Sequence, residues 1–425
     1  MPENKGDKLI SRETLRERAL VLHPSVHALK PKVQLEEAVG LALAIGLEVV
    51  LAEVVELGRL NPATLIGSGR IETYAELVEQ EDISIAIIDA ALSPTQQRNL
   101  ERALGTKVID RTGLILEIFG ERARTSEGVL QVELAQLNYL KSRLVRTWTH
   151  LERQRGGAGF MGGPGERQIE SDRRQIQEKI TRIKKNLVTV AKRRALHRKA
   201  RKEVPYPIIA LAGYTNAGKS TLFNRLTGAE VEADSRLFET LDPTLRSIKL
   251  PGGRKVILSD TVGFISDLPT ELVAAFKATL EEVLEADLIL HIRDASNPEM
   301  EDQKKDVEAV LATLGVDEDT PIVEVFNKTD LLAPELAEMF GANGVSALTG
   351  QGVNRLLEGI AGSFDALEPA VIVKLDEKDG KARAWLYQHG SAVKKTKGGL
   401  RLKLNPKAIG QFKKEFPEVK LKKNR

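Results

Sequence analysis

The chain has 425 residues, no cysteine and a formal net charge of only +3. A chain of this length is expected to form several domains, and the lack of cysteine excludes disulfides and thiolate metal sites. No signal-peptide pattern opens the sequence and no run of eighteen apolar residues occurs, so we expect a soluble cytoplasmic protein with no membrane span.

The charge is distributed unevenly along the chain. Residues 141–204 hold 19 Lys and Arg against 6 Asp and Glu, a net charge of +13. Residues 391–425 hold 12 against 2, a net charge of +10, so the remaining residues carry −20. Two basic segments on an otherwise acidic chain favour a polyanionic partner, in particular a nucleic acid. The alternative is a pair of solvated charged faces.

Residues 1–125 are predicted to form an N-terminal α/β domain. Helices are expected at 35–45, 67–79 and 91–103, and strands at 48–55, 83–89 and 107–110. Such alternation implies a parallel sheet. The helix start at Gly67-Ser68-Gly69-Arg70 could bind an anion, although an ordinary helix start fits the same residues. We find no set of catalytic residues in this part of the sequence.

Residues 126–204 are predicted to form an antiparallel helical hairpin. Leu130, Leu134, Leu137, Leu140 and Leu144 form one narrow apolar seam, and apolar residues between 169 and 190 form a second. Six of the ten residues at 156–165 are glycine, which predicts a non-helical tip between the helices.

The predicted tip carries residue types that suit RNA. Arg153, Arg155 and Arg167 flank it and could pair with phosphates, while Phe160 and Met161 would be exposed on it. An exposed aromatic ring can stack on a base, so we interpret the hairpin as an RNA-binding element. The alternative is a disordered linker.

A phosphate-binding loop lies at residues 213–220, within a third predicted domain at 205–365. Its sequence GYTNAGKS fits the pattern G-x-x-x-x-G-K-[ST], and it follows an apolar run and precedes a helix start. The backbone N–H groups would surround a phosphate, Lys219 would reach the β- and γ-phosphates, and Ser220 would hold Mg²⁺. The expected contact residues are Gly213, Tyr214, Thr215, Asn216, Ala217, Gly218, Lys219 and Ser220.

Two further motifs concern the phosphates and the metal ion. After an apolar run come Asp260, Thr261, Val262 and Gly263; Asp260 would hold Mg²⁺ through water, and Gly263 would turn its N–H toward the γ-phosphate. A switch loop is expected at Phe238, Glu239, Thr240, Leu241 and Asp242. Thr240 is our candidate to complete the Mg²⁺ shell, with Thr244 as its rival. The predicted catalytic residues are Lys219, Thr240 and Gly263.

Two more motifs concern the base. Asn327, Lys328, Thr329 and Asp330 follow an apolar strand, and the Asp330 carboxylate can accept hydrogen bonds from the N1–H and N2–H₂ groups of guanine. Adenine would leave that carboxylate unpaired, so selection for guanine should be steep and an ATP-driven or kinase-like protein is disfavoured. The backbone N–H groups of Ser346, Ala347 and Leu348 could meet the guanine O6.

The fold class predicted is α/β multidomain. Strands near 208, 247, 256, 288, 322 and 343 alternate with helices, which predicts a doubly wound, mostly parallel sheet with its ligand at the carboxyl ends of the strands. Residues 366–425 are predicted as a small α+β domain, with strands at 370–375, 383–387 and 400–404 and a helix at 407–416. We expect the lysine-rich end to be frayed.

The sequence resembles the HflX-type GTPases of the Obg–HflX group over nearly its whole length. The resemblance rests on the loop GYTNAGKS, the residues GERQIESDRR at 165–174 after the glycine-rich tip, and TLDPT at 240–244. It implies a GTPase that converts GTP to GDP with Mg²⁺ and binds the large ribosomal subunit, with the hairpin tip against ribosomal RNA near the peptidyl-transferase centre. It also implies that the protein splits stalled or idle ribosomes under stress such as heat.

The resemblance leaves some features open. An alternative function is GTP-dependent assembly of the large subunit. Potassium-activated GTPases hold K⁺ with an asparagine that Asn216 matches, although Asn216 could equally bond its own loop. Phe264 stands where small GTPases place a water-orienting glutamine, so we expect slow hydrolysis that the large subunit stimulates. We expect a monomer that is cytoplasmic and partly peripheral to the membrane through ribosomes.

Overall fold

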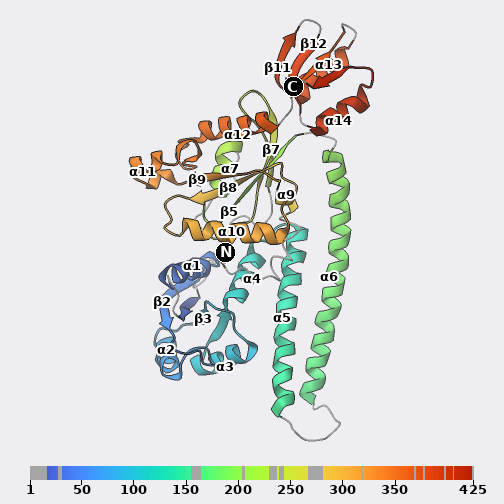
Figure 1. Cartoon of the computed structure of the whole chain (residues 1–425). Coiled ribbons are helices and arrows are strands. Elements are labelled where there is room, and N and C mark those ends of the chain that lie inside the picture. The colour runs from blue at the N-terminus through green and yellow to red at the C-terminus, as the bar shows by residue number, and fades with distance from the viewer. Residues whose placement is uncertain are drawn as a thin grey trace, which may run out of the picture. The chain divides into compact units, whose positions relative to one another are not determined.

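In the computed structural model, the chain forms two compact units. Figure 1 shows the helices and strands of the whole chain. The first unit comprises Met1–Glu121 and Leu140–Glu166, and the second comprises Arg122–Tyr139 and Arg167–Arg425. The structure describes residues 17–26, 31–154, 164–202, 206–228, 237–238, 244–266, 281–317, 319–367, 370–376, 379–396, 399–404 and 406–423.

The first unit contains a four-stranded parallel sheet with the order β2-β1-β3-β4. Its strands are β1 (Arg18–Ser25), β2 (Glu48–Glu56), β3 (Ile85–Ile88) and β4 (Lys107–Asp110). Its helices are α1 (Pro31–Ala44), α2 (Ser68–Gln80), α3 (Pro94–Leu104) and α4 (Arg111–Arg122). The predicted parallel sheet and its three predicted helices are confirmed. Two elements were not predicted from the sequence: α4, and β1, a central strand of the sheet.

Strand alternation explains how both faces of this sheet are covered. Leu20 and Leu22 of β1 pack in one cluster with Tyr74 of α2 and Leu100 of α3. Because successive residues of a strand face opposite sides, the intervening residue Val21 faces the other side, where α1 contacts β1 and β2. β1 is therefore buried on both faces.

Charged side chains lie buried just beyond the carboxyl ends of these strands. Asp89 accepts a hydrogen bond from Arg111 at 2.6 Å and lies 2.8 Å from His23 Nδ1, and Arg111 also pairs with Glu37. Burial raises the pKa of Asp89, but the hydrogen bond with His23 and the charge of Arg111 outweigh it and hold the pKa below its ordinary value. The ionised carboxylate is therefore part of what holds β1, β3 and α4 together.

The Asp89→Asn variant is expected to unfold more easily, by about 3 kcal/mol, because it leaves Arg111 buried with one carboxylate fewer. The folded pKa is depressed, so this stabilisation is fully present above the ordinary value of 3.8 and is lost as the pH falls through the folded pKa. Urea unfolding followed by circular dichroism should show a constant gap from wild type between about pH 5 and 8 that narrows below about pH 4. Asp82→Asn, at an exposed carboxylate, is the control, and an equal loss in both variants would contradict the argument.

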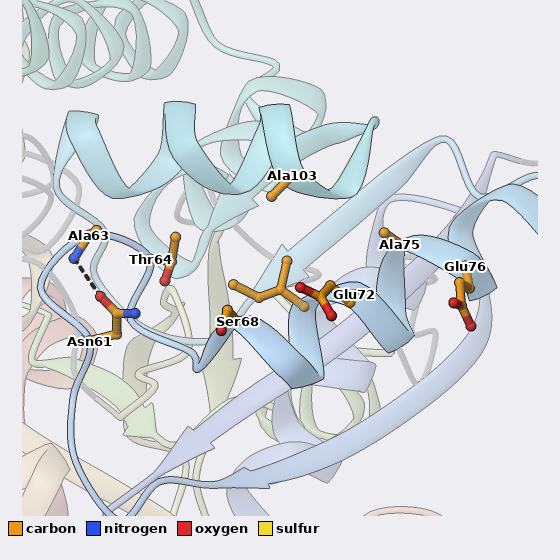
Figure 2. Close-up of a pocket in the computed structure, with 9 residues that line it drawn as sticks. Asn61, Ala63, Thr64, Ser68, Glu72, Ala75, Glu76 and Ala103 are labelled. Carbon is orange, nitrogen blue, oxygen red and sulfur yellow. Dashed lines mark hydrogen bonds between the residues drawn. The ribbon is translucent and has the colours of Figure 1, made fainter.

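A shallow pocket of about 440 Å³ lies beside the start of α2 (Figure 2). Asn61, Thr64 and Ser68 line it together with Glu72 and Glu76 from the first turns of the helix. The two carboxylates bring negative charge to the place where the sequence allowed an anion site, and so disfavour an anion there. The ordinary helix start is the better interpretation of Gly67-Ser68-Gly69-Arg70.

Two long helices follow the first sheet in sequence. They are α5 (Ser126–Gln154) and α6 (Pro164–Lys202). Leu137 of α5 is buried with Ile180 and Ile183 of α6, and Leu130 and Leu134 pack against the same cluster, so this part of the predicted seam is confirmed. Leu140 was predicted to belong to it but is 48% exposed. The tip residues Arg155, Phe160 and Met161 lie outside the described residues, as do the side chains of Arg153 and Arg167.

The second unit contains a five-stranded sheet with the order β6-β7-β5-β8-β9, parallel except for β6. Its strands are β5 (Ile208–Gly213), β6 (Thr244–Lys249), β7 (Lys255–Asp260), β8 (Leu288–Asp294) and β9 (Ile322–Asn327). The predicted doubly wound, mostly parallel sheet is confirmed. The sixth predicted strand, near 343, is wrong: the short 3₁₀ helix η2 (Gly341–Asn343) lies there, and only a single bridge joins Phe326 to Gly344.

Helices cover both faces of this sheet (Figure 1). Phe223 of α7 (Lys219–Thr227) and Leu356 of α12 (Val353–Leu367) pack with Leu211 and Leu290 on one face. The helices α9 (Glu281–Leu284) and α10 (Met300–Leu314) contact β5 on the other. The short elements η1 (Thr329–Leu331) and α11 (Pro334–Glu338) follow β9. The described residues contain no helix long and apolar enough to cross a membrane.

The last part of the second unit is a four-stranded antiparallel sheet with two helices. It consists of β10 (Ala370–Lys374), α13 (Gly380–His389), β11 (Ser391–Thr396), β12 (Gly399–Lys403), α14 (Pro406–Glu415) and β13 (Leu421–Lys423). The strands predicted at 370–375 and 400–404 and the helix at 407–416 are confirmed.

Two predictions for this part are wrong. The strand expected at 383–387 lies within α13, because Ala382 and Leu386 are spaced by one helical turn and both face the core. The lysine-rich end, expected to be frayed, forms β13, which pairs with β10 from Val371 to Val373.

Candidate nucleotide site

The predicted phosphate loop joins the end of β5 to the start of α7, and two of its glycines leave no room for a side chain. A Cβ atom on Gly213 would lie 2.2 Å from the carbonyl oxygen of Ile292, and a Cβ on Gly218 would lie 2.2 Å from Asn327 Nδ2. Gly218 also has a φ of 87°, which L-residues rarely adopt. The backbone therefore approaches its neighbours at the two positions where the motif requires glycine.

Two polar side chains of the loop, Lys219 and Ser220, are buried close to the D-x-x-G motif. Lys219 Nζ donates to the carbonyl oxygen of Tyr214 at 2.7 Å, and Ser220 Oγ donates to Asp260 Oδ2 at 2.8 Å. A Cβ on Gly263 would lie 3.0 Å from Lys219 Nζ, so this glycine comes close to the ammonium group. The fold thus brings together two residues predicted to touch the phosphates and two predicted to hold the metal ion.

Backbone hydrogen bonds hold the D-x-x-G segment along the loop. Phe264 accepts a hydrogen bond from the N–H of Thr215 at 2.7 Å and donates its own N–H to Gly213 at 3.1 Å. Thr261 Oγ1 donates to Leu211 O, and the N–H of Ser266 donates to the Tyr214 hydroxyl at 2.8 Å. The Phe264 side chain is only 2% exposed and carries no polar atom, so it offers nothing to orient a water molecule.

Asn327 links three of the predicted motifs through its side chain. Its Nδ2 donates to the carbonyl oxygen of Ala217 in the phosphate loop, and its Oδ1 accepts from the N–H of Ala347, both at 2.9 Å. The residue is buried at the end of β9, so its amide is fixed between the two loops. Asn327 was predicted to contact the nucleotide; in the structure its side chain joins the phosphate and base segments.

The remaining N-K-x-D residues differ in exposure. Lys328 has a φ of 63° and its Nζ lies 2.7 Å from Asp294 Oδ2. Thr329 is buried, whereas Asp330 on η1 is exposed and its carboxylate is open to a base. Among the described residues, only five other than glycine have a positive φ, and three of them (Asn216, Phe238 and Lys328) lie in predicted motifs. Strained backbone tends to occur at functional sites, which agrees with the motif assignment.

Arg225 is a residue of this site that the sequence analysis missed. It lies on α7, and its guanidinium donates to the carbonyl oxygens of Ala347, at 3.1 Å, and of Leu348. Within the same loop Ser346 is fully buried and its hydroxyl accepts from the N–H of Thr349 at 3.0 Å. Arg225 therefore holds the predicted base-binding loop from the helix that begins at the phosphate loop.

The Arg225→Ala variant is expected to release GDP about three to ten times faster, because charged hydrogen bonds at partly exposed positions contribute modestly. Hydrolysis measured at saturating GTP should stay close to wild type, since the residue acts on the base-binding loop and not on the phosphates. Release of a fluorescent GDP analogue measures the effect. Arg246→Ala, an exposed arginine on β6, is the control, and equal release from the two variants would show that Arg225 does not position the loop.

The switch loop is described only in part. Phe238 is 2% exposed with a φ of 57°, whereas Glu239, Thr240, Leu241 and Asp242 lie outside the described residues. Thr244, the rival of Thr240, begins β6 and pairs in register with Asp260.

The residues present at the site fit a magnesium ion. A hydroxyl and a carboxylate are the hard oxygen ligands that Mg²⁺ prefers, and Ser220 and Asp260 meet here with 8% and 0% exposure. Among the described residues there is no cluster of three His, Asp or Glu able to hold a metal. Mg²⁺ commonly takes one or two protein ligands together with water and substrate phosphates, so such a cluster is not required.

A phosphate loop, a D-x-x-G segment and an N-K-x-D motif at one edge of a doubly wound sheet define a GTPase. Three protein families match: one described as GTP-binding GTPase N-terminal at residues 32–120, one as GTP-binding GTPase Middle Region at 122–201, and one as 50S ribosome-binding GTPase at 208–328.

Curated relatives match over most of their length. The GTPase HflX of Magnetococcus marinus is 49% identical over 94% of this chain and 95% of its own, and that of Escherichia coli K12 is 43% identical over 88% of each. The chain belongs to the GTPase HflX family. A more distant likeness is to the solved structure of a GTP-binding protein from Sulfolobus solfataricus in complex with GDP, at 24% identity and a TM-score of 0.44 over 83% of this chain and 99% of that one.

Proposed function

We propose that this GTPase binds the large ribosomal subunit and splits stalled or idle ribosomes under stress, with GTP hydrolysis as the timer. The observation that carries the proposal is the joining of three of the motifs by Asn327 in a domain that matches the 50S ribosome-binding GTPase family. The net charge of +13 at 141–204 supports ribosomal RNA as the surface that the helical hairpin contacts.

The proposed roles follow the motifs. Asp330 and the loop at 346–348 select guanine, and Lys219 with the loop N–H groups binds the phosphates. Ser220, Thr240 and Asp260 would hold Mg²⁺, which when bound neutralises charge on the β- and γ-phosphates. Gly263 donates its N–H to the γ-phosphate when GTP is bound. The position of the D-x-x-G segment, which is hydrogen-bonded to the phosphate loop, would then depend on which nucleotide is bound.

The isolated GTPase is proposed to hydrolyse GTP slowly. Phe264 is buried and apolar where related enzymes place a water-orienting glutamine, so the chain lacks that group in this position. A group supplied by the ribosome would complete the site, and such groups accelerate related reactions by roughly 10³–10⁵-fold.

Asn216 is proposed to hold K⁺ beside the phosphates. Its side chain is exposed at the top of the loop and its φ of 58° turns the loop at this point. Hydrolysis should then be faster in KCl than in NaCl at equal ionic strength, and Asn216→Ala should abolish the difference. Equal rates in the two salts would count against a potassium site.

The proposed function is tested by measuring GTP hydrolysis with and without purified large ribosomal subunits, at low and moderate salt. A large stimulation that weakens with salt is expected, because contacts between cationic side chains and phosphates release counterions. Release of free subunits from whole ribosomes would support splitting. Binding only to immature large particles would favour an assembly factor, and no stimulation would remove the ribosome as the activator.

The domain organisation, oligomeric state and location of the protein are also proposed. We propose four domains, at 1–125, 126–204, 205–365 and 366–425, in a monomeric cytoplasmic protein that reaches the membrane only through bound ribosomes. Light scattering of the purified chain would test the monomer.

A further inference from the structure

The C-terminal segment has the strand and helix order βαββαβ, and its antiparallel sheet has the order β11-β12-β10-β13. This is the ferredoxin-like arrangement. Both helices cover the same face, since Leu386 of α13 and Phe412 of α14 share one core cluster with Val371, Val373 and Leu402. Alternate strand residues must therefore point to the opposite face.

The register of the strands places a row of cations across that opposite face. Lys394 of β11 pairs with Arg401 of β12, Arg401 pairs with Ile372 of β10, and Ile372 pairs with Lys422 of β13. Neighbouring strands lie about 4.8 Å apart, so Lys394 and Arg401 are one strand spacing apart, and Arg401 and Lys422 are two spacings apart with Ile372 between them. Lys394, Arg401 and Lys422 are exposed, and Lys374 lies on the same face two residues from Ile372.

This face carries positive charge that none of the described side chains neutralises. The four strands contain seven Lys or Arg and no Asp or Glu. Within the described part of the chain, the side chains of Lys394, Arg401 and Lys422 form no ion pair, whereas Lys403 pairs with Asp365. Like charges directly opposite each other on a sheet are destabilising, as for Lys394 and Arg401, so folding stability does not explain the row.

We propose that this open face, here called the cationic sheet face (Lys374, Lys394, Arg401 and Lys422 around Ile372), binds single-stranded RNA through its phosphates. Open four-stranded sheets are a common platform for single-stranded RNA. Domains that read the sequence stack bases on aromatic residues of the sheet, but the central position here is Ile372, and the strands contain no aromatic residue. The contact is therefore to phosphates and independent of sequence.

A row of cations across an open sheet face, with no carboxylate in its strands, suits a phosphate chain better than the irregular carboxylates of an acidic protein surface. The inference goes beyond the proposed function, because it assigns a second RNA contact that requires neither the GTPase site nor the hairpin. It stands or fails independently of whether ribosomes stimulate hydrolysis.

The test measures the binding of the full chain to oligouridine and oligoadenosine by fluorescence anisotropy over a range of salt concentrations. In the triple variant Lys394→Ala, Arg401→Ala, Lys422→Ala, affinity at low salt should fall about tenfold or more, and the slope of log affinity against log salt should shrink by about 2, since each phosphate contact contributes about 0.7. The control variant Lys381→Ala, Lys413→Ala, Lys414→Ala removes the same charge from the two helices and should change neither.

A charge-preserving variant, Lys394→Arg, Arg401→Lys, Lys422→Arg, should bind like wild type and shows that the loss comes from charge and not from misfolding. An equal loss in the helix control would overturn the proposal in favour of diffuse electrostatic attraction. Tighter binding of polyglutamate than of RNA, lost in the same triple variant, would overturn it in favour of an acidic protein partner. A strong preference for one homopolymer would contradict binding through phosphates alone.

Discussion

The Asp330→Asn variant should lose affinity for GTP by roughly 10⁴-fold and gain affinity for xanthosine triphosphate. In the proposed site the carboxylate accepts two hydrogen bonds from the guanine edge, and an amide in its place would present a donor where the base also has a donor. Xanthine carries a carbonyl in place of the N2 amine, so the amide and the base become complementary again. Because Asp330 is exposed on η1 and contributes nothing to a core, the protein should remain folded.

Nucleotide competition against a fluorescent GTP analogue measures this change. Glu335→Gln is a matched control, since it also replaces an exposed carboxylate by an amide, five residues further along the chain and outside the motif. Unchanged affinity for GTP in Asp330→Asn, or an equal loss in Glu335→Gln, would show that base recognition lies elsewhere.

The second large effect is expected for Gly218→Ala, which should weaken nucleotide binding by about 10²-fold or more. The added methyl group would lie 2.2 Å from Asn327 Nδ2, so either the phosphate loop or the Asn327 side chain must move. Movement of Asn327 breaks its hydrogen bonds to Ala217 and Ala347 and separates the phosphate segment from the base segment. A preorganised binding site requires its loops to stay in place, so this movement should weaken nucleotide binding.

The effect of backbone strain must be distinguished from the effect of this steric clash. A second glycine, at the end of α7, provides the comparison. Gly228 ends the same helix with a φ of 67°, but no atom lies within 4 Å of a Cβ built there. Gly228→Ala therefore carries only the left-handed strain, about 1–2 kcal/mol, and should bind GTP normally. Calorimetric titration with GDP distinguishes the two variants, and equal weakening would assign the effect to strain and not to the contact with Asn327.

Local signals explain what could be predicted from the sequence. The phosphate loop could be identified because its two glycines and Lys219 lie at fixed positions within eight consecutive residues. The parallel sheets were predicted because apolar runs alternated with helical periods. Prediction was wrong near 383–387, since an aromatic and apolar run fits a strand and a helix equally well until its partners are known.

The sequence by itself determined the class of the protein, the motifs predicted to bind the nucleotide and the two basic segments, because each depends on residue type and short spacing. Only the tertiary structure decided that Asn327 and Arg225 join the phosphate and base loops, since Ala217 is 110 residues from Asn327, and Ala347 and Leu348 are 122 and 123 residues from Arg225. The same is true of Lys394, Arg401 and Lys422, which come from three strands. Strand register aligns them in one row, and register depends on the buried apolar residues that pair the strands.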